Sequence, residues 1–204
     1  VQNSLNRNLR LTTTEDNREL VRVSLLRAIQ AYPDNTVYPE LLVWHFNQIR
    51  DFASSVVHAK ALDLRLQEQG IRLMELGNTA QANGDTDTAL ECYRYVAAKG
   101  PSNPYFFTAR NEVLQVRFDA LTQEVPADVE ALSALAEEYA ASLRDLGVRS
   151  ETAMMVKDMA YLLAFYLQRA PEGIEALEAL IAENDLNERV AAACKLTLGD
   201  IYVF

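Results

Sequence analysis

Apolar residues recur every three or four positions along most of the chain, and short polar, glycine or proline segments interrupt the pattern. The stretch 73–103 shows this most clearly, with two apolar stripes separated by Gly84 and Asp85: Leu73, Leu76 and Ala80, then Ala89, Tyr93 and Val96. The spacing predicts two short amphipathic helices that face each other, the second ending before Pro101. Gly77 lies inside the first helix, where it costs about 1 kcal/mol relative to alanine, so we expect another helix to cross it closely.

This two-helix pattern repeats in the chain. A shift of 34 residues places Leu42 on Leu76, Phe46 on Ala80, Asp51 on Asp85, Ser55 on Ala89 and Ala59 on Tyr93. Two periods apart, the chain has Pro33, Asp34 and Asn35 and then Pro101, Ser102 and Asn103, which predicts the same turn between units. Near the end, residues 198–202 read Leu-Gly-Asp-Ile-Tyr and predict the first helix of a further unit.

The residues Leu76, Gly77, Ala80, Gly84, Asp85, Ala89, Tyr93 and Pro101 resemble the tetratricopeptide repeat (TPR) signature, whose period is about 34 residues. Leu73 and Ala80 stand where the family has large aromatic residues, so this copy is degenerate. The resemblance implies an all-α, right-handed superhelix of about five stacked helical hairpins. The chain is also similar to large bacterial TPR proteins that are often exported, and this similarity implies a periplasmic or cell-envelope location.

The pattern gives specific boundaries. We expect residues 1–13 to be a partly ordered lead-in and residues 14–204 to form a single TPR-like array. The helix that starts at Thr14 should end before Pro33, and Ser150 should cap the eighth helix. Its helices are predicted at about 14–32, 36–49, 52–68, 70–83, 86–99, 103–122, 127–146, 151–169, 171–183 and from 187 onward. We also expect the native polypeptide to continue beyond Phe204, because the last helix lacks its second half.

Composition removes several classes of function. The formal net charge of −10 argues against a nucleic-acid partner, which requires a basic surface. The longest apolar run, 159–167, is too short for a transmembrane span of about 20 residues. Cys92 and Cys194 are far apart in sequence, so we expect two buried thiols and no disulfide.

Motifs for chemistry are absent as well. The chain has no G-x-S-x-G, glycine-rich phosphate loop, C-x-x-C or H-E-x-x-H motif. His45 and His58 are its two histidines, and we expect them at the surface or at helix edges, without a metal. We therefore predict a protein that is not an enzyme and has no cofactor. A helical-toroid hydrolase or glycan-binding module is the catalytic alternative, and acids and aromatic residues meeting in a closed cavity would indicate it.

In TPR proteins the concave wall carries the partner, and the resemblance transfers that role to the exposed side of each first helix. The wall positions include Val37, Ile71 and Thr108, and the predicted partner-binding residues are Glu40, Trp44, Asn47, Gln48, Met74, Asn78, Gln81, Tyr105, Glu112 and Gln115. The side-chain amides could bind the backbone of an extended peptide, with Trp44, Met74 and Tyr105 as apolar anchors.

Two other interpretations of this wall stay open. Trp44 could pack on a neighbouring helix while the amides are merely solvated. The chain could also be an envelope assembly subunit that uses its convex face or its ends, which exposed apolar residues there would indicate. The family's carboxylate clamp is not supported, because Glu40 and Met74 stand where it has lysine. The predicted partner is a protein or peptide.

Overall fold

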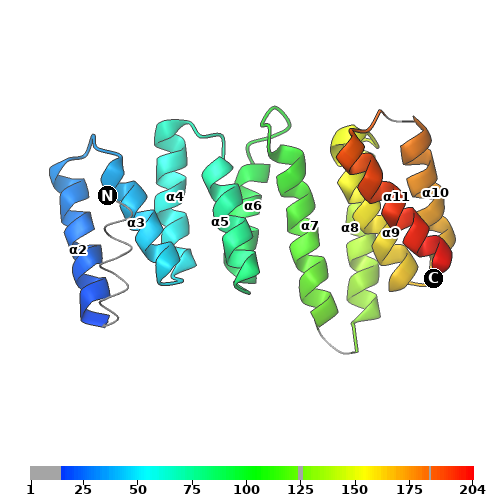
Figure 1. The fold of residues 1–204 in the computed structure, drawn as a ribbon, viewed down its shortest axis with the longest axis horizontal. Helices are drawn as coiled ribbons and strands as arrows, with labels where there is room; N and C mark the ends of the chain where they lie inside the picture. The colour runs from blue at the N-terminus through cyan, green and yellow to red at the C-terminus, as the bar shows by residue number, and fades with distance from the viewer. Residues whose placement is uncertain (1–14, 124–125, 184) are drawn as a thin grey trace. The chain divides into compact units, whose positions relative to one another are not determined.

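The computed structural model describes residues 15–123, 126–183 and 185–204, and these residues form helices and turns with no strand (Figure 1). The predicted lead-in, 1–13, lies outside the described residues. The chain divides into two compact units, unit 1 (Val1–Val96) and unit 2 (Ala97–Phe204). The prediction of an all-α helical-repeat fold is therefore confirmed, whereas the single continuous array stays a prediction.

Within unit 1 the described residues form α2 (Glu15–Ala31), α3 (Val37–Gln48), α4 (Phe52–Leu66), α5 (Ile71–Ala82) and α6 (Thr86–Ala97), and each of α2 to α5 packs on its sequence neighbour in this series. Leu42, Phe46 and Ala59, which the 34-residue shift places over inward residues of 73–103, are buried, and so is Val56 on α4. His45 is buried too, with 1% of its surface exposed. The expectation of surface histidines is thus wrong for His45, because it lies on the apolar side of α3 between Leu41, Leu42 and Phe46.

The 34-residue period is visible in the hydrogen bonds of the turns. Asp51 accepts from the Ser54 N–H at 3.1 Å, and Asp85 accepts from the Thr88 N–H at 3.1 Å. The N–H of Asp51 donates to the Phe46 carbonyl, as the N–H of Asp85 does to the Ala80 carbonyl. An acceptor side chain before the first turn satisfies a helix donor that would otherwise lack a partner. The two turns are therefore copies of one structure.

The proline turns repeat in the same way two periods apart. The side-chain oxygen of Asn35 accepts from the Val37 N–H at 3.0 Å, and that of Asn103 accepts from the Tyr105 N–H at 2.9 Å. These bonds fix the entry of the next helix, so the predicted turn is confirmed at both places.

At Gly77, where a close crossing by another helix is predicted, the side chain of a residue on α6 packs closely. A Cβ added there would lie 2.7 Å from Cε1 of Tyr93, so the Tyr93 ring occupies space that only glycine leaves open. This contact explains why the sequence keeps a poor helix former in the middle of α5.

Unit 2 contains α7 (Phe106–Gln123), α8 (Val129–Leu146), a 3-10 helix η1 (Ser150–Thr152), α9 (Ala153–Phe165), α10 (Ala170–Glu183) and α11 (Glu188–Val203). Helix α9 packs against α8, α10 and α11 and is central to this unit. Figure 1 shows α10 and α11 beside it. A core cluster that includes Leu135, Tyr139, Leu162 and Leu177 fills the space between them.

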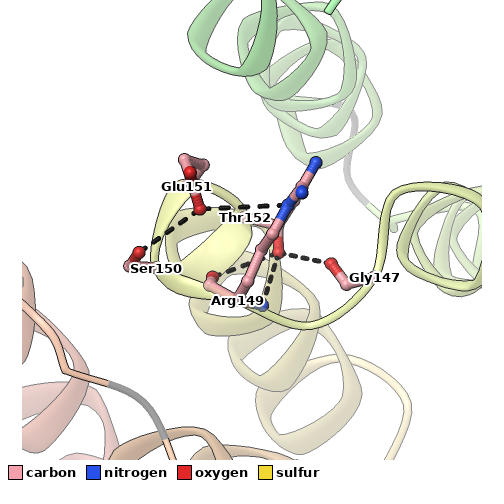
Figure 2. Close-up of polar contacts among 5 residues, drawn as sticks. All are labelled: Gly147, Arg149, Ser150, Glu151 and Thr152. Carbon is pink, nitrogen blue, oxygen red and sulfur yellow. Dashed lines mark hydrogen bonds and ion pairs between the residues drawn. The ribbon is translucent and has the colours of Figure 1, made fainter.

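The helix predicted at 151–169 is α9 in the structure, and it differs from its prediction at both ends. The connection from α8 is organised by Thr152, whose hydroxyl donates to the Gly147 carbonyl at 2.7 Å and accepts from the Arg149 N–H at 3.1 Å (Figure 2). Ser150 was expected to be the cap, but its hydroxyl points to Glu151. The helix ends at Phe165 rather than 169, because Gln168 takes a left-handed conformation in the following turn.

Candidate functional site

A pocket of about 280 Å³ lies between α3 and α5, the first helices of two successive repeats in unit 1. Both helices contribute residues spaced three or four apart, which places them on one face of each helix. The lining residues are Glu40, Val43, Trp44 and Asn47 from α3, and Arg72, Glu75, Leu76 and Thr79 from α5. The structure therefore brings together three predicted site residues, Glu40, Trp44 and Asn47.

Asn47, a lining residue of this pocket, carries a buried hydrogen-bond acceptor. Its side-chain oxygen has no hydrogen-bond partner among the residues that the structure describes. A buried amide oxygen without a partner costs about 1–3 kcal/mol, so an incoming N–H donor would gain that free energy back. Trp44 stands one turn away on the same helix and is partly exposed, so it offers an apolar surface beside the acceptor.

Arg72 is the positively charged residue of the pocket lining, and its guanidinium is paired with a carboxylate beside the pocket. Its guanidinium makes two hydrogen bonds to the carboxylate of Glu68, at 2.5 and 2.8 Å. These bonds raise the pKa of Arg72, and the nearby carboxylates of Glu40 and Glu75 raise it further. Since the guanidinium is committed to Glu68, Glu40 and Glu75 leave the pocket with an acidic rim.

The amides of Asn78 and Gln81 are held by a residue of the next helix. The buried hydroxyl of Tyr93 lies 2.6 Å from the Asn78 side-chain oxygen and 3.0 Å from that of Gln81. The Tyr93 ring reaches this position because Gly77 has no side chain. The Tyr93 hydroxyl therefore orients the side-chain oxygens of Asn78 and Gln81 toward α6.

The remaining predicted residues are spread over different surroundings. Gln48 is exposed, whereas Met74 is buried with 7% exposed and packs inside unit 1. Tyr105, Glu112 and Gln115 belong to unit 2, where Tyr105 precedes α7 and Gln115 donates to Asp119 at 3.0 Å. The predicted ladder of amides along one continuous wall therefore stays a prediction.

Sequence reasoning missed Arg72, Glu75, Thr79 and the role of Tyr93. The 34-residue shift selects the same face on each first helix, but a pocket between α3 and α5 is lined by opposite flanks of the two helices. The signal that was available is the spacing of Arg72, Glu75 and Thr79, which matches a helix face next to Leu76.

Metal-ligating groups, thiols and apolar helices of the described residues bear on other kinds of site. In the described part of the chain, no three or more His, Cys, Asp or Glu residues are grouped so that they could hold a metal ion. Cys92 and Cys194 are free and buried, and burial raises the pKa of the Cys92 thiol to about 12. None of the helices within the described ranges combines the length and the apolar character needed to cross a membrane.

The fold and this pocket define a helical-repeat protein with an inter-repeat pocket. The chain matches no protein-family model and no curated protein.

Proposed function

We propose that this chain is a TPR-like, non-catalytic module that binds an extended segment of another protein at the pocket between α3 and α5. The observation that carries the proposal is the buried, unpartnered side-chain oxygen of Asn47 beside Trp44. A peptide backbone N–H would satisfy Asn47, while an apolar side chain of the same peptide would cover the indole. The repeated turns at Asp51 and Asp85 support the TPR-like character.

The size and charge of the pocket limit which peptide sequences could bind in it. A volume of about 280 Å³ holds one or two side chains, so the pocket suits a short anchor sequence better than a folded surface. Glu40 and Glu75 disfavour an acidic anchor, which agrees with the absence of a lysine for a carboxylate clamp. The periplasmic or cell-envelope location remains part of the proposal and rests on the family resemblance alone.

The proposal is tested with peptides selected on the intact chain from a random display library. The affinity of a labelled selected peptide is then measured by fluorescence anisotropy for three proteins: wild type, Trp44→Ala and Leu64→Ala. Leu64 is an exposed apolar residue of unit 1 on α4, so it serves as the matched control. Loss of a buried aromatic anchor should cost about 2 kcal/mol, which is about a 30-fold increase in Kd. Unchanged binding by Trp44→Ala would refute the pocket.

A second candidate, an assembly subunit that uses its second helices, is favoured by two observations. On α4, Val57 and Leu64 are 65% and 69% exposed. In unit 2, a pocket of about 430 Å³ between α8, α9 and α10 has a floor of alanines with Met159 and Leu163. If Leu64→Ala weakens binding while Trp44→Ala does not, this candidate replaces the first.

A further inference from the structure

A pocket of about 430 Å³ lies between α8, α9 and α10 in unit 2, and we call it the unit 2 pocket. Helices α8 and α10 both pack on α9, which contributes Met159 and Leu163 to the lining. The other apolar lining residues are Ala136 and Ala140 from α8, and Ala176 and Ala179 from α10. Alanine side chains are short, so the space between the three helices stays open, and its volume is large enough for a large apolar side chain.

The pocket lining next to the α9–α10 turn is fixed and electrically balanced. Gln168 has a φ of 57°, and the following N–H, that of Arg169, donates to the Leu163 carbonyl at 2.8 Å. The Arg169 guanidinium makes two hydrogen bonds to the Glu172 carboxylate, both at 2.6 Å. Since this pair carries one charge of each sign, it adds no net charge to the lining.

The remaining charged residues of the described lining are both carboxylates. They are Glu137 on α8 and Glu175 on α10, and both are exposed. On α10 the lining residues are 172, 175, 176 and 179, which is the spacing of one helix face over two turns, about 10 Å. The acidic side chains and the alanines of α10 therefore share one face. The apolar pocket thus carries an uncompensated negative charge on each of two helices that line it.

We propose that the unit 2 pocket binds a basic amphipathic helix of another protein, with one apolar side chain of that helix in the pocket and a neighbouring lysine or arginine paired with Glu137 or Glu175. Burial of that side chain against Met159 and the alanines removes apolar surface from water and provides affinity. The two carboxylates select a basic sequence through complementary charge. A helix fits the shape, because a ridge of side chains on one helix packs into the groove that other helices leave.

Two other occupants are opposed by charge. A second copy of this chain has a formal net charge of −10, so the two copies repel each other. An acidic peptide would meet the carboxylates of Glu137 and Glu175 without a cation to pair with them. The inference names the partner for the second candidate function, and it does not depend on the pocket between α3 and α5.

The test uses the intact chain and a helical peptide of about 15 residues made from leucine, alanine and lysine, with the leucines on one face. One matched peptide has glutamate in place of lysine, and another has glutamine in place of leucine. Binding is measured by fluorescence anisotropy of the labelled peptide, and the NMR signal of the Met159 methyl group reports entry into the pocket. We expect saturable binding and a shift of the Met159 signal with the leucine–lysine peptide alone.

Two matched variants on α10 separate the pocket from general attraction to an acidic protein. Ala179 and Ala182 are both exposed, and Ala179 is the one that lines the pocket. Ala179→Lys places a long cationic side chain in the pocket and should weaken binding about tenfold. Ala182→Lys makes the same change of charge one turn away and should leave the Kd unchanged.

The rim charges are tested with a pair of double variants. Glu137→Gln combined with Glu175→Gln should weaken binding about fivefold, because the lysines of the peptide lose their charge partners. The control is Glu188→Gln combined with Asp200→Asn, which removes two exposed charges of α11 outside the lining and should leave the Kd unchanged.

Trp44→Ala and Leu64→Ala should not change these results, so the two candidate surfaces of unit 1 can fail without failure of the unit 2 pocket. The proposal is overturned if the glutamate peptide binds as tightly as the lysine peptide, or if Ala179→Lys and Ala182→Lys weaken binding equally. It is also overturned if sedimentation shows a wild-type dimer that Ala179→Lys separates, because the occupant is then a second copy of the chain.

Discussion

Unit 1 and unit 2 are built from similar helix pairs but are held together in different ways. In unit 1, α3, α5 and α6 have 12 residues each, and buried polar groups such as Asp63 and Tyr93 link α4, α5 and α6. In unit 2, α7 and α8 have 18 residues each, and a large apolar cluster surrounds α9. The 34-residue period thus holds where α3, α5 and α6 share one short length, and it is lost in unit 2, where longer helices pack around α9.

The largest expected effect concerns the polar link of unit 1. Asp63 is buried and accepts from the Gly70 N–H at 2.5 Å and from the Tyr95 hydroxyl at 2.8 Å, which joins α4, α5 and α6. Asp63→Ala leaves both donors without this acceptor and should lower the free energy of unfolding by about 3 kcal/mol. Urea unfolding followed by circular dichroism measures this change.

The control for this variant is Asp34→Ala, because Asp34 is exposed in the turn before α3. Equal stabilities of the two variants would show that unit 1 does not depend on its polar links, and the contrast between the units would fail.

The next effect concerns close packing in unit 2. A Cβ on Gly173 of α10 would lie 2.8 Å from the Ala160 carbonyl oxygen of α9, and backbone cannot rotate away as a side chain can. Gly173→Ala should therefore lower the free energy of unfolding by about 1 to 2 kcal/mol. This net value is the cost of overpacking minus the gain from the higher helix propensity of alanine. Gly199→Ala on α11 meets nothing within 4 Å and should stabilise by about 0.5 to 1 kcal/mol. Thermal unfolding that ranks the two variants in the opposite order would contradict apolar close packing around α9.

A smaller effect on stability is expected at the two copies of the turn in unit 1. Arg50 has a φ of 60°, where the copy 34 residues later has Gly84 with a φ of 80°. A left-handed conformation costs a residue with a side chain about 1–2 kcal/mol, and glycine removes this cost. Glycine also loses more conformational entropy on folding, so the net gain is smaller than the strain removed. Arg50→Gly should therefore stabilise unit 1 by about 0.5 kcal/mol, and Gly84→Ala should destabilise it. Denaturant midpoints test both, and a destabilised Arg50→Gly would mean that the turns are not equivalent.

The last predicted difference between the units is the direction in which their stability changes with pH. Both histidines lie in unit 1, and burial lowers the pKa of His45 and of His58. The unfolded state then binds more protons, so unit 1 should lose stability as the pH falls below about 6.5, the ordinary value for histidine.

In unit 2 the raised pKa of Glu112 acts in the opposite direction, because the folded state binds the proton more readily. Its contribution is lost as the pH rises through the folded pKa, so unit 2 should not lose stability between pH 7 and 5. Residue-resolved hydrogen exchange at both pH values measures the two units separately. Parallel losses in both units would contradict this assignment.

The periodic features of the fold could be predicted from sequence, while its polar interior could not. The predicted helices all exist, because each buries a stripe of apolar residues at helical spacing. Glu40, Trp44 and Asn47 were predicted for the site because they lie on one helix face. Asp63 and Tyr93 could not be predicted in their hydrogen-bonding roles, since the partners of a buried polar group lie on other helices. Arg72 was missed for the same reason: its place in the pocket depends on how α3 faces α5.

The most direct test of the central claim uses Trp44, the single tryptophan of the chain, as its own reporter. A peptide selected on the intact protein is titrated while the emission spectrum of Trp44 is recorded, with a scrambled peptide as the control. Binding in the pocket should cover the partly exposed indole and shift its emission to shorter wavelength, saturating at the Kd measured by anisotropy. A peptide that binds with that Kd and leaves the emission of Trp44 unchanged would place the partner elsewhere and contradict the account.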